Sequence, residues 1–313
     1  MATTKRIELK DSGIIFNEQE HTYYDPKADK FLSGITQVIQ RQLFPNEFDN
    51  IPEAILKEAA AYGTSIHHAC QDFDQNWIND GSQEVQDYIT ICKDYHLIHE
   101  RSEFTLTYKE WATNADKIFR TSDDTFSIGD IKSYGQKMTP EKLEKARWQL
   151  SCMAMFFNEQ YKKAKIDKLF IIHLRNKQRK DGTIDHQAEI IFINRIPPEI
   201  CKELLAADLA GEQFKNPYAV PDEIKSQEEH IIGLLQTKAE IEEELSLIKA
   251  KVLLKMSALE QKTWATDKIR FTRKLPTTRT SFDVAKFRES NPDIDLTPYE
   301  KVSTVSESLQ ITI

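Results

Sequence analysis

The chain has 313 residues, with 42 basic and 50 acidic side chains, a formal net charge of −8 and a hydrophobic fraction of 40%. This apolar content can form a large core and excludes an intrinsically disordered chain. No apolar run approaches the roughly 20 residues of a membrane helix, and the polar N-terminus has no apolar segment typical of a secretion signal. The four widely spaced cysteines suggest neither a disulfide framework nor a zinc ribbon. We therefore expect a cytoplasmic protein without a membrane partner.

The first 100 residues combine a short β segment with helical patterns. Aromatic and apolar residues over 13–24, followed by the turn signal Asp25-Pro26, predict a small hairpin. Apolar spacing then predicts three helices, over residues 52–62, 64–77 and 83–96. Gly63 is expected to separate the first two, with Thr64 or Ser65 as the N-cap of the second.

The period changes to that of β-strands after residue 101. Five strands are predicted, over residues 102–108, 117–120, 126–133, 168–175 and 184–193, with a turn over 177–182 between the last two. Helices are predicted over 140–161 and after Pro197-Pro198. This order of elements indicates an α/β fold, in which helices pack on a sheet.

A long amphipathic helix is predicted over residues 222–263. One face carries a 3-4 repeat, called the seam below, which consists of Ile231, Leu234, Lys238, Ile241, Leu245, Ile248, Val252, Lys255 and Leu259. Such a repeat is typical of a coiled coil, and therefore of a homo-oligomer, but it also fits a helix that packs on its own domain. The sequence alone does not choose between the two.

The C-terminal segment is locally basic. Between residues 264 and 280 it carries one acid, Asp267, and five basic residues: Lys268, Arg270, Arg273, Lys274 and Arg279. Basic clusters contact nucleic-acid phosphates when they share one surface, and are otherwise solvated surface charge. We therefore divide the chain into a core over 1–221, a helix over 222–263 and a basic tail over 264–313.

One pattern of charged residues points to chemistry. Asp116 lies near one predicted strand, and Asp130-Ile131-Lys132 lies on the next. Because residues i and i+2 of a strand share a face, Asp130 and Lys132 project together. Carboxylate and carbonyl oxygens suit Mg²⁺ or Mn²⁺, and an ion-bound water beside a lysine suits phosphodiester hydrolysis. By itself the pattern is weak, since charged residues on a solvated strand face also produce it.

The pattern belongs to a larger series of motifs in a fixed order. The segments are Gly63-Thr64-Ser65-Ile66-His67, Ser102-Glu103, Ala115-Asp116, Gly129-Asp130-Ile131-Lys132-Ser133 and Trp148-Gln149-Leu150. In this order they resemble the PD-(D/E)XK nuclease superfamily, specifically its RecB-like branch. The resemblance implies a restriction-endonuclease-like core, which is a central mixed β-sheet flanked by helices.

The resemblance also implies roles for individual residues. The implied metal ligands are His67, Asp116, Asp130 and the backbone carbonyl of Ile131, with Glu103 as a further carboxylate near the metal or an exposed strand acid. Lys132 is implied to be the catalytic lysine, and Gln149 to hold the active site or the DNA backbone. His68 is an alternative to His67, although the spacing from Gly63 favours His67. Two positions depart from the pattern, because Thr113 replaces a glycine and Met153 a tyrosine.

The tail resembles that of phage recombination exonucleases through Lys268-Ile269-Arg270-Phe271 and Arg279-Thr280-Ser281-Phe282-Asp283. The resemblance implies a Mg²⁺- or Mn²⁺-dependent exonuclease that resects duplex DNA ends for a single-strand annealing partner, in a bacterial host cytoplasm. The absence of a cysteine after Cys201 argues against an iron-sulfur cluster, and no phosphate-binding loop indicates ATP use. The candidate DNA contacts are Arg179, Lys180, Lys268, Arg270, Arg273 and Lys274. The alternatives are a structure-specific or restriction-type endonuclease and a non-catalytic DNA-binding adaptor.

Overall fold

The computed structural model describes residues 6–18, 20–48, 51–178, 184–276, 286, 287, 290, 291 and 294. The chain divides into two compact units, residues 1–217 and 218–313. The boundary lies close to the one expected after residue 221. The long helix and the tail, which we expected to be separate parts, fall in the same unit.

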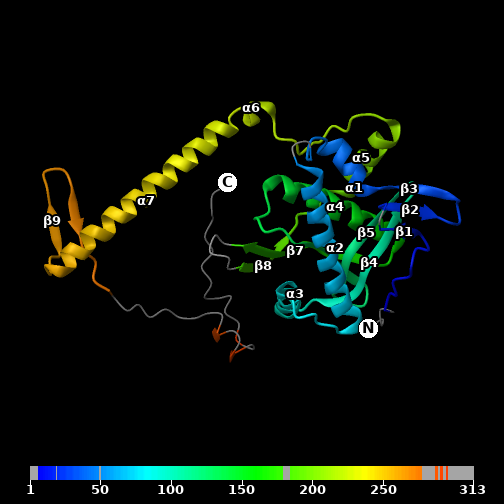
Figure 1. Cartoon of the computed structure of the whole chain (residues 1–313), viewed down its shortest axis with the longest axis horizontal. Helices are drawn as coiled ribbons and strands as arrows, with labels where there is room; N and C mark the ends of the chain where they lie inside the picture. The colour runs from blue at the N-terminus through cyan, green and yellow to red at the C-terminus, as the bar shows by residue number, and fades with distance from the viewer. Residues whose placement is uncertain are drawn as a thin grey trace. The chain divides into compact units, whose positions relative to one another are not determined.

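An eight-stranded mixed sheet forms the centre of the first unit and confirms the predicted α/β fold (Figure 1). Seven strands follow the order β1-β2-β3-β5-β6-β7-β8, and β4 pairs with β5 outside this path. The β3–β5 and β6–β7 pairs are parallel, and the other pairs are antiparallel. The strands are β1 Ile15–Asn17, β2 Thr22–Asp25, β3 Lys30–Gly34, β4 Ile98–Tyr108, β5 Trp111–Arg120, β6 Thr125–Lys132, β7 Lys165–Gln178 and β8 Ile184–Phe192.

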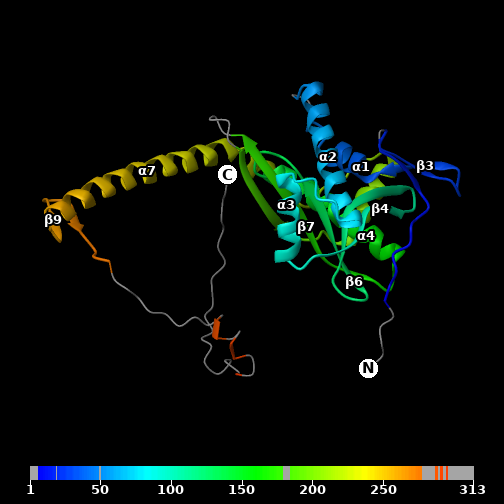
Figure 2. The same ribbon diagram turned by 60° about the horizontal axis from the view of Figure 1, so that its bottom comes forward.

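Helices cover both faces of this sheet (Figures 1 and 2). They are α1 Ile35–Leu43, α2 Glu53–Asn76, α3 Gln83–Asp94, α4 Pro140–Gln160 and α5 Pro198–Ala210. One hydrophobic cluster joins α1, α4 and α5 to one face, and a second joins α2 and α3 to the other. The start of α4 is fixed locally, because the Thr139 hydroxyl accepts a hydrogen bond from the Lys142 N–H and Pro140 is the first helical residue. At the start of α3 the Ser82 hydroxyl likewise accepts a hydrogen bond from the Val85 N–H.

One prediction for the N-terminal region is wrong, and another is incomplete. Gly63 does not separate two helices, and Thr64 or Ser65 is no N-cap, because α2 runs without interruption from Glu53 to Asn76. Glycine destabilises a helix interior by only about 1 kcal/mol relative to alanine, so the good helix formers around it continue the helix. The predicted hairpin is present as the antiparallel β1–β2 pair, and it is followed by β3 and α1, two elements that the sequence pattern did not indicate.

Strand β5 forks the sheet. One edge of β5 pairs with β4 from Trp111 to Arg120. The opposite edge pairs with β3 at residues 111–112 and with β6 at residues 117–120. Between these two ladders the backbone of residues 113–116 has no strand partner on that edge, so the sheet opens at Asp116.

The second unit contains the predicted long helix in shortened form. Its elements are α6 Asp222–Lys225, α7 Glu228–Ala258, β9 Thr263–Ala265 and β10 Arg270–Thr272. The predicted start at residue 222 is wrong, since α6 is a separate turn of helix before α7. The tail between 264 and 276 forms the β9–β10 hairpin and its exit. Most of the tail beyond residue 276, including Arg279, lies outside the described residues.

Two further expectations concern a loop and the membrane. The predicted turn over 177–182 connects β7 to β8, but residues 179–183 lie outside the described part of the chain. None of the described helices is long and apolar enough to cross a membrane.

Two glycine substitutions test how closely the side chains of the sheet pack around β6. A Cβ on Gly129 of β6 would lie 2.7 Å from a ring carbon of Phe170 and 3.0 Å from one of Phe119. We expect Gly129→Ala to lower the free energy of unfolding by about 1–3 kcal/mol, because it overpacks the stacked ring pair. Gly63→Ala is the control, since its nearest neighbour would be 3.8 Å away and alanine favours a helix. Urea unfolding measures both, and equal losses of stability would contradict this account.

Candidate metal centre

Three elements each bring one potential metal ligand to the fork in the sheet. His67 comes from α2, Glu103 from β4 and Asp116 from β5, and one ligand atom from each lies within 4.8 Å of the other two. The Nδ1 atom of His67 is 3.6 Å from Oδ2 of Asp116 and 3.7 Å from Oε1 of Glu103. We call these three residues the acidic cluster.

The backbone of Ile131 completes the cluster from β6. Its N–H donates a hydrogen bond to Oδ2 of Asp116 at 2.8 Å, at the point where the β5–β6 ladder stops. The N–H and C=O of one strand residue point to the same edge, so the Ile131 carbonyl faces the same gap. There it lies 3.0 Å from Nε2 of His67. The fork therefore supplies a carbonyl oxygen beside the imidazole and two carboxylates.

Glu103 has an unusual backbone conformation. Its φ angle is 45°, which lies in the left-handed region that non-glycine residues rarely adopt. The carboxylate is held by the Asn114 side-chain amide, which donates to Oε2 at 2.9 Å and accepts from Thr105 at 2.8 Å. Backbone strain of this kind is typical of functional sites. The Glu103 carboxylate is thus held beside His67 and Asp116.

The sequence reasoning missed Tyr23 of β2 as well as Asn114 and Thr105. Tyr23 is buried, and burial raises the pKa of its hydroxyl, with further increases from the charges of Glu103 and Asp116. It therefore presents a neutral O–H group close to the cluster. No local motif marks these residues, because they reach the site only through the pairing of distant strands.

Asp130 and Lys132 form a separate pair beside the cluster. Lys132 Nζ donates to Oδ1 of Asp130 at 2.9 Å, and the Asp130 side chain is 3% exposed. The pKa of Asp130 is raised to about 6. Burial is the main cause, the charge of Lys132 opposes the increase, and the charge of Asp116 adds to it. Burial alone would lower the pKa of Lys132, but Asp130, Tyr134 and Asp116 raise it above its ordinary value. Lys132 is therefore a cation at neutral pH and donates hydrogen bonds.

These residues fit a divalent cation. Oδ2 of Asp130 is buried and lies 2.8 Å from the Lys132 ammonium, which also contacts Oδ1, so Asp130 is paired with this lysine and the fit rests on the other donors. The donors around the fork are mostly hard oxygens, with the His67 nitrogen as the exception, and this set suits Mg²⁺ or Mn²⁺.

A buried polar network anchors the elements that carry the cluster. Asp74 of α2 lies 2.6 Å from Nζ of Lys117, and both side chains are at most 5% exposed. Lys117 also donates to the Ser102 hydroxyl at 2.8 Å. Asp74 follows His67 by seven residues, or two helical turns, so both lie on the same face of α2. Ser102 precedes Glu103, and Lys117 follows Asp116. Each element that supplies a ligand is thus fastened by a neighbouring residue.

The other predicted residues are not members of the acidic cluster that the described residues form. His68 lies 3.2 Å from Glu18 and is half exposed, whereas His67 faces the acids. Gln149 of α4 donates a hydrogen bond at 3.3 Å to Thr36 of α1, which is not a predicted site residue. Lys268, Arg270, Arg273 and Lys274 belong to the second unit, where all but Arg273 are exposed. Arg179 and Lys180 lie outside the described residues.

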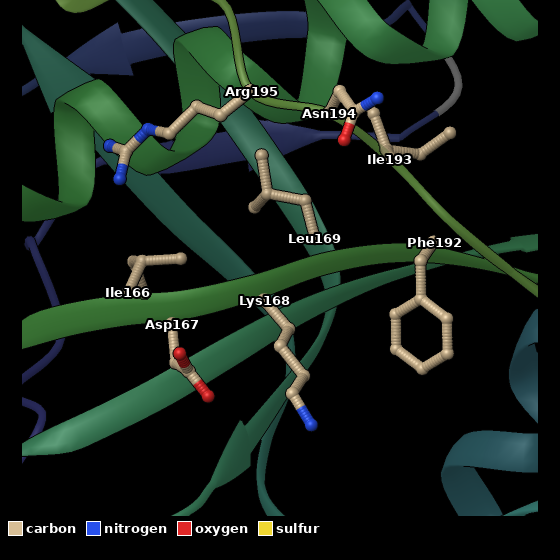
Figure 3. A pocket seen from close by; sticks show the side chains of 8 residues that line it. All are labelled: Ile166, Asp167, Lys168, Leu169, Phe192, Ile193, Asn194 and Arg195. Carbon is tan, nitrogen blue, oxygen red and sulfur yellow. The ribbon is translucent and has the colours of Figure 1, made fainter. Parts of the chain in front are cut away.

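One pocket on the sheet lies away from the residues of this site. It has a volume of about 270 Å³ and is lined by Ile166–Leu169 and Phe192–Arg195. Its basic side chains, Lys168 and Arg195, diverge from each other (Figure 3). None of the residues that form the acidic cluster lines it, so it adds nothing to the metal centre.

Comparison with known proteins does not identify this chain. No family model matches the sequence, and no curated protein matches it. Among solved structures, the chain is similar to the crystal structure of SSO0001 at 12% identity and a TM-score of 0.30, over 59% of this chain and 76% of that one. A TM-score this low carries no argument about function, so the function has to be argued from the residues.

The buried anchor predicts a specific pattern of stabilities. We expect Lys117→Met to lower the free energy of unfolding by about 3–5 kcal/mol, because it leaves the Asp74 carboxylate buried without its cation. The double variant Asp74→Leu/Lys117→Met removes both charges and is expected to recover most of this loss. Urea unfolding of both single variants and the double variant gives the coupling energy. Additive losses would contradict the assigned pair.

The charge of His67 gives a second prediction. Burial alone would lower the pKa of His67, but Asp116 and Glu103 raise it to about 9. Its proton therefore stabilises the metal-free fold fully below pH 6.5, and this contribution is lost as the pH rises through 9. An NMR titration of the imidazole, assigned with His67→Asn, is expected to show a midpoint near pH 9. A midpoint near 6.5 would contradict the geometry of the cluster.

Proposed function

We propose that this protein is a Mg²⁺- or Mn²⁺-dependent deoxyribonuclease, with exonuclease action on duplex ends preferred. The observation that carries the proposal is the convergence of His67, Glu103, Asp116 and the Ile131 carbonyl beside the Asp130–Lys132 pair. A cation held there would stabilise phosphate charge and lower the pKa of a bound water. Asp116 and Glu103 would hold it, with His67 and the Ile131 carbonyl, and Asp130 would contribute from beside them while paired with Lys132.

Lys132 has a defined part in this proposal. Because its pKa is raised, it is a poor general base and acts instead as a charged hydrogen-bond donor. It can orient an attacking water and neutralise negative charge that develops on the phosphate. Asp130 holds the ammonium in place through the 2.9 Å hydrogen bond. The sequence left open whether the lysine positions or deprotonates the water, and its charge favours positioning.

The preference for DNA ends rests on the resemblance of the motifs and tail to phage recombination exonucleases. The exposed Lys268, Arg270 and Lys274 are available to contact phosphates. A partner that anneals the resulting single strand is part of the same proposal.

Substitution of Lys132 tests the catalytic proposal. We expect Lys132→Ala to lose cleavage of a linear, 5′-labelled duplex by at least about 100-fold. DNA binding should change little, because the ligands and the tail remain. Lys168→Ala, an exposed lysine of neighbouring β7, is the control and should cut at the parent rate. Cleavage by Lys132→Ala at the parent rate would refute the assignment.

A linear duplex and a covalently closed circle together distinguish an exonuclease from an endonuclease and from a non-catalytic adaptor. An exonuclease degrades the linear duplex and leaves a covalently closed circle of the same sequence intact. Cleavage of both substrates would indicate the endonuclease. Failure to cut either substrate in the presence of Mg²⁺ or Mn²⁺ would favour the non-catalytic adaptor.

Metal binding can be tested without activity. Mn²⁺ at about 100 times its dissociation constant is expected to stabilise the fold by about 2.7 kcal/mol. Asp116→Asn should abolish most of this gain, because it removes a charged ligand, and Asp130→Ala should reduce it. The exposed Asp72→Asn on α2 is the control. Thermal unfolding with and without Mn²⁺ measures the effect, and equal stabilisation of all variants would exclude this ligand set.

A further inference from the structure

Helix α7 exposes a long apolar seam. It has 31 residues, which corresponds to a length of about 46 Å. The seam residues Leu234, Ile241, Leu245 and Ile248 are 46–57% exposed. Among the residues of α7, Met256 alone is buried. An exposed apolar stripe of this length with heptad spacing marks a surface for another helix.

The charges of α7 are divided between its two halves. Residues 228–244 contain six acids and one lysine, whereas residues 245–259 contain three lysines and no acid. Beside the seam, Glu242 and Glu244 flank the first half, and Lys249 and Lys251 flank the second. A helix with this distribution is complementary to a reversed copy of itself.

We propose that α7 pairs with α7 of a second copy of this chain in an antiparallel coiled coil. The two-fold axis lies between Ser246 and Leu247. In this register Ile241 of one copy meets Val252 of the other, and Leu245 meets Ile248, which gives four apolar layers. This pairing does not depend on the proposed nuclease function.

The flanking charges select this arrangement. In the antiparallel register, Glu242 lies next to Lys249 of the other copy, and Glu244 next to Lys251. By symmetry the dimer contains four such pairs. A parallel dimer pairs only Glu244 with Lys249, and it places the acids at 240–244 of both copies side by side. Like charges at such positions oppose pairing.

The two seam lysines limit the apolar core. Lys238 of one copy meets Lys255 of the other at each end of the four layers. Their long side chains can extend into solvent, and Nζ of Lys238 already lies 3.9 Å from Glu242 of its own helix. The four apolar layers of the proposed coiled coil are therefore bounded by a lysine layer at each end.

Spin-label distances in the full-length protein test the orientation. Labels on Gln236→Cys are expected to be separated by about 32 Å along the axis, and labels on Ala250→Cys by about 10 Å. A parallel pair gives the same distance at both positions and would overturn the proposal. The unsubstituted chain controls for labelling of the half-buried Cys92.

Light scattering with size-exclusion chromatography tests the pairing itself. The parent chain is expected to have the mass of a dimer, and Leu245→Asp at least a tenfold weaker dimer. The control is Leu247→Asp, which places the same change on the opposite side of α7 and should remain dimeric. Circular dichroism checks that both variants stay folded. A monomeric parent, a larger oligomer or equal effects of the two substitutions would overturn the proposal.

Discussion

The Asp116 carboxylate accepts the N–H of Ile131 where the β5–β6 ladder ends, and the arrangement of the site follows from this hydrogen bond. Strand β5 exchanges one neighbour for another at this point, so its backbone leaves a gap in the sheet. The Asp116 side chain takes the place of the missing ladder bond and is thereby fixed. The same gap exposes the Ile131 carbonyl, which meets His67. A topological feature of the sheet thus brings together the side chains that we propose as cation ligands.

The ligands also need rigid supports, which a buried ion pair next to them in the chain provides. The Asp74–Lys117 pair and the Ser102 hydroxyl connect α2, β4 and β5 one residue or two helical turns away from each ligand. Desolvated charges stabilise a fold little when both are present, but loss of one is costly. The Asp74–Lys117 pair therefore contributes more to the relative positions of α2, β4 and β5 than to the net stability of the fold.

Much of the fold was predictable because strand and helix periods differ, and β4 to β8, α3, α4 and α5 follow their patterns. Gly63 misled the prediction, since propensity is weak against the helix formers around it. For the site, motif order named His67, Asp116 and, with an alternative, Glu103, and the structure brings these three side chains together. Asn114, Thr105 and Tyr23 were not predictable, because they reach the site through long-range strand pairing. The positive φ of Glu103 likewise has no signature in its sequence.

The most direct test of the central claim, that the fork in the sheet is a cation site, is anomalous diffraction from crystals soaked in Mn²⁺. The account predicts a manganese peak bounded by the side chains of His67 and Asp116 and the carbonyl of Ile131. It also predicts that the His67 contact to that carbonyl gives way to metal coordination. Absence of a peak at this position, or a peak only at other acidic groups, would contradict the account.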